Sequence, residues 1–170
     1  MGTPIDTSQV LKVAIEMEKE GYKFYTENAK KISDEAGRAM FQQLAKDELD
    51  HQKLFETEYD SLTRTGKWRS MKQLPDSAFL KSHVFPSAEK VKKSQQKPNE
   101  LKALDIGLEL ERRSYEFYYG EAQRTNEPDA KAMLNHIAEI EKGHISILEA
   151  EKDYLTNTGY WFDYREITLE

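Results

Sequence analysis

The chain has 170 residues, of which 38% are hydrophobic and 33% are charged, with a formal net charge of −6 and no cysteine. This length suits a single domain, residues 1–170, that can bury a sizeable core. The negative charge argues against a nucleic-acid partner, and the absence of cysteine excludes disulfides, iron–sulfur clusters and thiolate chemistry. Because no apolar run approaches the roughly 20 residues of a membrane span, we expect a cytoplasmic protein with no membrane partner.

The first predicted helix begins near residue 8, where Asp6, Thr7 or Ser8 can cap it. Its inward stripe repeats with a period near 3.6 residues and contains one acid, Glu18. The members of this stripe are Leu11, Ala14, Ile15, Glu18, Gly21, Tyr22, Tyr25, Ala29 and Ile32. An acid in the middle of an apolar stripe is unusual for a helix that faces a core.

The second predicted helix is capped by Ser33 and ends at Gly66, which completes a first helix pair over residues 8–66. Its inward stripe also contains polar groups, Glu48 and His51. The full stripe is Phe41, Leu44, Glu48, His51, Phe55, Tyr59 and Leu62. This helix therefore directs a carboxylate and an imidazole toward the core, three residues apart.

A stretch with three prolines, residues 67–98, is expected to be a long crossover with one short helical piece inside it. The second helix pair spans residues 99–158, with a third helix from Asn99 and Pro128 in the first turn of a fourth, and a tail follows over residues 159–170. The third stripe is Leu104, Gly107, Leu108, Glu111, Ser114, Tyr115, Tyr118 and Ala122, and the fourth is Leu134, Ile137, Glu141, His144, Leu148 and Leu155. Two pairs and one long connection predict an all-α, ferritin-like four-helix bundle.

The two pairs are one pattern written twice, with a constant shift of 93 residues: 111 − 18 = 93, 141 − 48 = 93 and 144 − 51 = 93. The same shift relates Tyr25 to Tyr118, and it places the segment TRTGKW at 63–68 on TNTGYW at 156–161. General amphipathic likeness explains a leucine that matches an isoleucine, but not Glu-x-x-His matching Glu-x-x-His. The repeat predicts pseudo-two-fold symmetry and a symmetric object on the axis.

Residues three apart on a helix project together, so each Glu-x-x-His places its carboxylate beside its imidazole. With Glu18 and Glu111, one from each remaining helix, four carboxylates and two imidazoles converge on the bundle axis. Unpaired, four buried carboxylates would each cost several kcal/mol. Two divalent cations balance the four negative charges, which predicts a dinuclear metal site. The alternative, solvated glutamates, conflicts with their register among apolar neighbours.

At these positions the sequence resembles the rubrerythrin and ferritin-like di-iron proteins, through EKEGYKFY (18–25), ERRSYEFY (111–118), ELDH (48–51) and EKGH (141–144). The resemblance implies that Glu18 and Glu111 are terminal metal ligands, that Glu48 and Glu141 bridge the metals, and that His51 and His144 each complete one metal. It also implies that the Tyr25 and Tyr118 hydroxyls hydrogen-bond the ligand carboxylates. Glu16, Glu109, His83 and His136 are expected to be ordinary polar residues.

Two departures from the rubrerythrin pattern concern its redox chemistry. Rubrerythrins usually carry a rubredoxin-like module with four cysteines, which this chain lacks, so electrons must come from a separate rubredoxin-like protein or reductase. Rubrerythrins also place a further glutamate three residues after the third-helix ligand, where this chain has Ser114. The remaining six-ligand set is closer to the bacterioferritin type.

Carboxylates with one imidazole per ion suit iron, and zinc or manganese could replace it. The first hypothesis is a di-iron oxidoreductase that reduces hydrogen peroxide or dioxygen and protects against oxidative stress. The alternatives are a ferroxidase that handles or stores iron, and a metal-free helical interaction protein. A homodimer is expected for each.

Overall fold

The computed structural model describes residues 6–69 and 97–162, in which there are four helices and no strand. The helices are α1 (Thr7–Ala29), α2 (Glu35–Thr65), α3 (Pro98–Arg124) and α4 (Pro128–Thr158). The predicted all-α four-helix bundle is thus confirmed. The short helical piece expected inside the crossover lies outside the described residues, as does most of the C-terminal tail. Among the described helices, none combines the length and the apolar character needed to cross a membrane.

Local side chains account for where the helices begin and end. Asp6 caps α1 by accepting a hydrogen bond from the backbone N–H of Ser8. Asp34, and not the predicted Ser33, caps α2, because its carboxylate accepts from two backbone N–H groups of the first turn. α2 ends as predicted at a left-handed glycine, Gly66 with φ 68°, and α4 ends in the same way at Gly159 with φ 77°.

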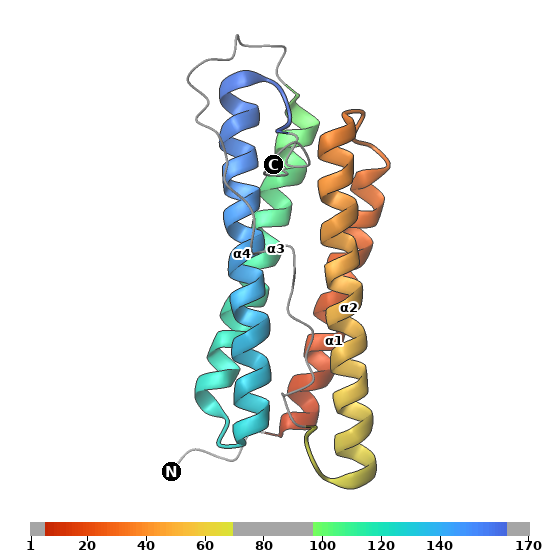
Figure 1. The fold of residues 1–170 in the computed structure, drawn as a ribbon, viewed down its shortest axis with the longest axis vertical. Helices are drawn as coiled ribbons and strands as arrows, with labels where there is room; N and C mark the ends of the chain where they lie inside the picture. The colour runs from red at the N-terminus through yellow and green to blue at the C-terminus, as the bar shows by residue number, and fades with distance from the viewer. Residues whose placement is uncertain (1–5, 70–96, 163–170) are drawn as a thin grey trace, which may run out of the picture.

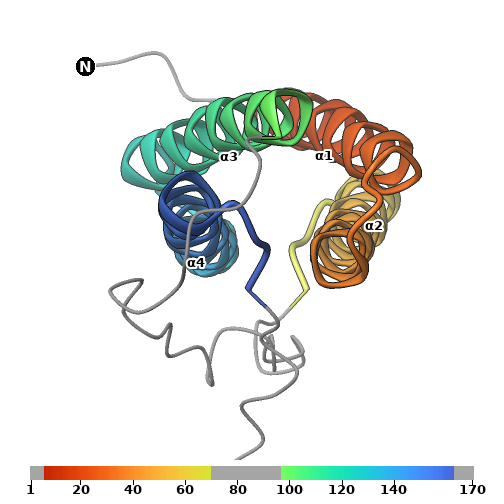
Figure 2. The same cartoon turned by 90° about the horizontal axis from the view of Figure 1, so that it is seen from above.

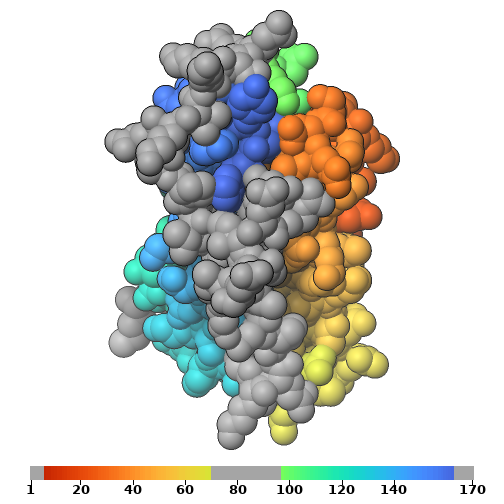
Figure 3. Space-filling model, turned by 45° about the horizontal axis from the view of Figure 1, so that its top comes forward, coloured from red at the N-terminus to blue at the C-terminus, as the bar shows by residue number. Residues whose placement is uncertain are grey.

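The helices form two hairpins, α1–α2 and α3–α4, which stand side by side (Figure 1). Seen from above, α1 and α3 are neighbours, and α2 and α4 both lie on the same side of them (Figure 2). Most contacts run within each hairpin, and the main contact between the hairpins is made by α1 and α3. The space-filling view likewise places the two hairpins on opposite sides of the molecule (Figure 3).

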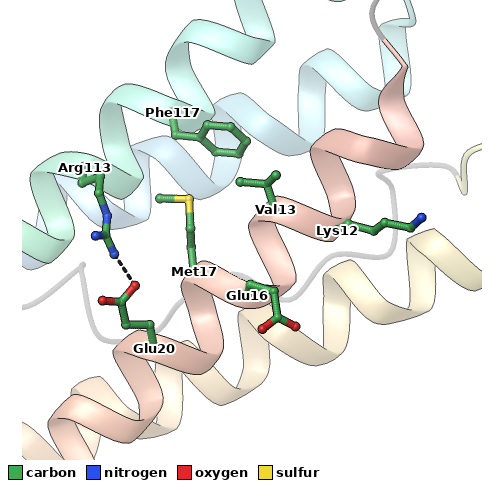
Figure 4. Close-up of a pocket in the computed structure, with 7 residues that line it drawn as sticks. All are labelled: Lys12, Val13, Glu16, Met17, Glu20, Arg113 and Phe117. Carbon is green, nitrogen blue, oxygen red and sulfur yellow. Dashed lines mark hydrogen bonds and ion pairs between the residues drawn. The ribbon is translucent and has the colours of Figure 1, made fainter.

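One ion pair marks the pseudo-two-fold axis. Glu20 of α1 and Arg113 of α3 are equivalent positions in the repeat, since 113 − 20 = 93, and their side chains meet at 2.6 Å. Two equivalent residues can touch each other only where they straddle the axis. Figure 4 shows this pair beside Met17 and Phe117, in a shallow pocket on the α1–α3 face.

The apolar core is divided into two clusters. One cluster contains Tyr25, Phe41, Leu44, Leu104, Leu148 and Trp161, and the other contains Leu11, Phe55, Tyr118, Met133, Leu134 and Ile137. Along every helix the glutamate or Glu-x-x-His motif falls between a residue of one cluster and a residue of the other. A polar layer therefore crosses the middle of the bundle, closed off at both ends by packed hydrophobic side chains.

Two aromatic positions refine the sequence prediction. Tyr22 was expected to face inward but is 37% exposed, because it lies at the edge of the α1 stripe, from which its hydroxyl can reach water. Trp161 packs against the bundle end: it lies over Gly37 and contacts Phe41 edge-on, and its indole N–H donates to Glu100 at 2.6 Å.

Candidate metal centre

The polar layer consists of six side chains, and none of them is more than 6% exposed. α1 and α3 supply one glutamate each, and α2 and α4 supply a glutamate and a histidine each. The six are Glu18, Glu48, His51, Glu111, Glu141 and His144. The structure therefore brings together every residue that the sequence predicts as a metal ligand. Glu16 and Glu109 are exposed, His136 is half-buried and outside the layer, and His83 lies outside the described residues.

The ligand atoms form two groups, and within each group all atoms lie within 4.8 Å of one another. One group is Glu18, Glu48, His51 and Glu141, and the other is Glu48, Glu111, Glu141 and His144. Glu48 and Glu141 belong to both groups. This arrangement offers two adjacent cation positions that share two carboxylates. Each position also has one glutamate and one histidine that the other position does not use.

Both histidines direct Nδ1 into the layer. Nδ1 of His51 lies 3.3 Å from a Glu18 oxygen and 3.2 Å from a Glu141 oxygen. Nδ1 of His144 lies 3.2 Å from Glu141, 3.4 Å from Glu111 and 3.6 Å from Glu48. The two rings are nearly parallel, with centroids 6.0 Å apart. All six donors thus face a common interior point from the four helices.

A test of whether this layer fits metal ions is the pairing of its buried atoms. Oxygen atoms of all four glutamates and Nδ1 of His51 are buried without a hydrogen-bond partner. Buried polar atoms are almost always paired, so a cluster of unpaired ones that face each other needs an explanation. Carboxylate and imidazole donors at this spacing are those of a divalent transition-metal site, so the residues fit such ions.

Two buried tyrosines tie the hairpins together at this layer. The Tyr25 hydroxyl of α1 donates a hydrogen bond to Glu111 of α3, and the Tyr118 hydroxyl of α3 donates to Glu18 of α1. Each tyrosine thus holds the glutamate of the opposite hairpin and leaves that glutamate's second oxygen unpaired. Burial, and then the nearby carboxylates, raise the pKa of both tyrosines above the usual range, which keeps their hydroxyls protonated as donors.

Gly21 leaves room for one of the shared carboxylates. A Cβ atom at this position would collide with an Oε atom of Glu48. The equivalent position in the second hairpin is Ser114 (114 − 21 = 93), which is buried. Both equivalent positions therefore hold small residues, a glycine in the first hairpin and a serine in the second.

Electrostatics shift the titration of two carboxyl groups upward. Burial raises the pKa of Glu48 well above its usual range, and the carboxylates of Glu111, Glu18 and Glu141 add to the shift. Burial and Glu141 raise the pKa of Glu111 to about 8, against the opposing effect of His144. In the absence of a metal, burial and the neighbouring carboxylates favour the protonated form of both groups.

The two histidines and Glu141 are shifted toward their charged forms. Burial alone would lower the pKa of His51, but Glu141 and Glu18 outweigh it and raise the pKa to about 10. Burial is likewise outweighed at His144, whose pKa rises through Glu111, Asp47 and Glu141. Glu141 keeps a lowered pKa because the two imidazolium groups outweigh its burial. Protons thus balance the charges that divalent ions would balance, and metal binding must release them.

The sequence interpretation missed three acids, of which Glu58 and Glu151 are buried and Asp47 is half-buried. Asp47 precedes Glu48 and lies 3.4 Å from His144. Glu58 and Glu151 are equivalent in the repeat (151 − 58 = 93), and each accepts a hydrogen bond from the backbone of the segment after its helix, at Arg69 and Phe162. The repeat shift of 93 residues could have identified Glu58 and Glu151 as an equivalent pair, whereas no sequence signal marks Asp47.

Comparisons with known proteins agree with this geometry. A family model described as Rubrerythrin matches residues 9–152. Among solved structures, a hypothetical protein from Pyrococcus furiosus has a TM-score of 0.66 at 26% identity and covers 92% of this chain and 98% of its own. A protein from Thermotoga maritima, described as a candidate ferritin-like diiron-carboxylate protein, has a TM-score of 0.61 at 26% identity and covers 90% of this chain and 98% of its own. No curated protein matches.

Proposed function

The chain belongs to the rubrerythrin family and has its ferritin-like four-helix fold, and from this premise we propose that it is a di-iron oxidoreductase that reduces hydrogen peroxide or dioxygen. A buried cluster of glutamate and histidine in a chain of this family indicates iron binding. The observation that carries the proposal is the pair of ligand groups that share Glu48 and Glu141. Two ions with common ligands can act together as one two-electron centre.

In this proposal each residue has a defined role. Glu18 and His51 would hold one ion, Glu111 and His144 would hold the other, and Glu48 and Glu141 would serve both. Two bound Fe(II) ions would supply two electrons in total, which is enough to reduce one hydrogen peroxide molecule to two water molecules with the uptake of two protons. Zinc and manganese bind similar donors and could occupy the same positions.

The surroundings of the ligands support this chemistry. The Tyr25 and Tyr118 hydroxyls fix the orientation of the terminal glutamates, so that these carboxylates need not reorganise when charge at the centre changes. The two apolar clusters exclude bulk water from the layer at both ends. The gap at Gly21 gives Glu48 space to change its mode of binding.

Electrons must be resupplied from outside the chain. With no cysteine, the chain cannot build a rubredoxin-like iron site of its own. We propose that a rubredoxin-like protein or a reductase is the donor, and that the protein works as a homodimer.

The proposal is tested by loading the metal-free protein with Fe(II) under anaerobic conditions and then adding hydrogen peroxide or dioxygen separately. We expect about two Fe(II) per chain and rapid oxidation by one of the oxidants, followed by absorption spectroscopy. Glu48→Ala should abolish the reaction, and Glu16→Ala, at an exposed position of α1, should leave it intact. Iron binding without oxidation by either oxidant would contradict the proposed activity.

An iron-handling ferroxidase is the second candidate. It is favoured by Ser114, because this small residue stands where rubrerythrins carry a further glutamate. A storage protein must form a large hollow shell that takes up many irons per chain. Sedimentation distinguishes the oxidoreductase from a storage protein, because a dimer that binds two irons per chain cannot be a hollow storage shell.

A further inference from the structure

The six proposed ligands obey the internal repeat, but one acid beside them does not. Asp47 lies on α2, immediately before Glu48, and its equivalent on α4 is Ile140 (140 − 47 = 93). Ile140 is a buried apolar residue. Any role that Asp47 has toward the centre is therefore present on one side of the pseudo-two-fold axis only.

Asp47 reaches across from α2 to the histidine of α4. Its Oδ2 atom lies 3.4 Å from Nε2 of His144 as an ion-pair contact, and both atoms are buried with no hydrogen-bond partner. The other carboxylate oxygen, Oδ1, accepts a hydrogen bond of 2.8 Å from the side-chain amide of Gln43, one turn earlier on α2. Gln43 therefore fixes the orientation in which Asp47 faces His144.

An acceptor at Nε2 decides how His144 presents its other nitrogen. In the neutral ring that binds a metal, a proton kept on Nε2 faces Asp47, and the lone pair of Nδ1 then faces Glu48, Glu111 and Glu141. A carboxylate behind a ligating imidazole fixes the ring and makes it a stronger ligand. His51 has ion-pair partners only at Nδ1, namely Glu18 and Glu141, among the described residues.

We propose that Asp47 is a positioning residue that makes the two metal positions unequal. The position completed by His144 binds a divalent cation more tightly and fills first, and the position completed by His51 fills second. This inference rests on the metal centre of the proposed function and adds an order of filling and the residue that sets it.

The test is a titration of the metal-free full-length protein with Co(II), whose visible absorption reports each binding step. Wild type should bind in two steps that differ at least about tenfold in affinity. Asp47→Asn should weaken the tighter step by about 10–100-fold, the usual effect of losing such a partner, and leave the weaker step within about threefold. Asp50→Asn is the matched control, because it removes the same charge from an exposed position of the same helix.

Two further measurements assign the steps. A crystal structure with one equivalent of Co(II) should show anomalous density beside His144 and not beside His51. Gln43→Leu, which removes only the hydrogen bond that orients Asp47, should weaken the tighter step by a smaller factor. This variant leaves Asp47 itself in place, so it decides the question if Asp47→Asn does not fold.

The outcomes separate this inference from the function beneath it. Two steps of equal affinity in wild type, or equal weakening of both steps by Asp47→Asn, would overturn the role of Asp47 and leave a two-metal centre standing. A wild-type protein that binds no divalent metal would overturn both.

Discussion

The two hairpins are copies of each other at the centre and differ in what surrounds it. The ligand residues, the two tyrosines, the terminal glycines and the buried pair Glu58 and Glu151 all recur at a shift of 93 residues. The neighbours do not: Asp47 matches Ile140, Gly21 matches Ser114, and Phe41 matches Leu134. Charge balance around two cations needs a symmetric set of donors, whereas packing needs only complementary volumes. The comparison thus separates residues that the chemistry requires from those that adjust to local space.

The largest expected effect comes from removing a residue that both ligand groups share. Glu141→Ala deletes a carboxylate of both ligand groups, whereas Glu18→Ala deletes one of a single group. We expect bound metal to fall from about two ions per chain to about none in the first variant, and to about one in the second, because a bridging ligand serves both ions. Metal analysis after dialysis measures this.

The thermal melts of these variants provide the control. Metal should raise the melting temperature of wild type and of Glu18→Ala, and should not change that of Glu141→Ala, since only bound ligand stabilises the folded state. If Glu141→Ala kept both ions, the sharing of this carboxylate would be wrong.

The next effect tests a place where the copies differ in packing. A Cβ atom at Gly37, in the first turn of α2, would collide with the indole of Trp161, whereas the equivalent position of α4 is already Ala130. Gly37→Ala should therefore destabilise the protein by about 1–3 kcal/mol through overpacking. Ala130→Gly should destabilise it by about 0.5–1 kcal/mol through backbone entropy. Urea unfolding measures both changes.

If the collision with Trp161 causes the loss of stability in Gly37→Ala, a smaller residue at position 161 should relieve it. In a Trp161→Leu background the smaller side chain leaves room for the new methyl group, so the penalty of Gly37→Ala should largely disappear. A penalty of the same size in both backgrounds would show that the indole is not its cause.

The sequence predicted the centre better than its surroundings, for physical reasons. Helical spacing places Glu48 beside His51 without any tertiary information, and the constant shift identifies the second copy. Asp47 could not be found in this way, because its importance depends on His144, which approaches from the other hairpin. The exposure of Tyr22 likewise depends on how far the neighbouring helices extend over its ring, which the sequence of one helix does not show.

The crossed tyrosine bonds test whether the symmetry extends one layer beyond the donors. Tyr25→Phe removes the hydrogen bond to Glu111, and Tyr118→Phe removes the one to Glu18. Each should destabilise the metal-free protein by about 1–2 kcal/mol, because the buried carboxyl group loses its donor. Urea unfolding of the two variants in the presence of a chelator measures the effect. A difference of more than about 1 kcal/mol between them would show that the asymmetry reaches this layer.

The last effect appears only as the pH rises and concerns Glu151 and its equivalent, Glu58. Glu151 accepts a hydrogen bond from the backbone of Phe162 at 2.8 Å, but its Oε2 has no hydrogen-bond partner among the described residues, and burial raises its pKa to about 8. Below an unfolded-state pKa near 4.5 both states hold the proton. Between there and about pH 8 only the folded state holds it, so this group lowers stability as the pH rises.

Glu151→Gln keeps an acceptor for the Phe162 amide and removes this titration, so it should match wild type near pH 5 and exceed it by about 1–2 kcal/mol at pH 8. The metal-ligand layer titrates identically in both proteins, so the difference between their urea-unfolding curves isolates Glu151. Glu58 instead has Arg69 beside it, through the backbone N–H at 3.0 Å and the guanidinium at 4.0 Å, so Glu58→Gln should bring no gain at either pH. Equal responses of the two variants would mean that the cation beside Glu58 does not distinguish these otherwise equivalent acids.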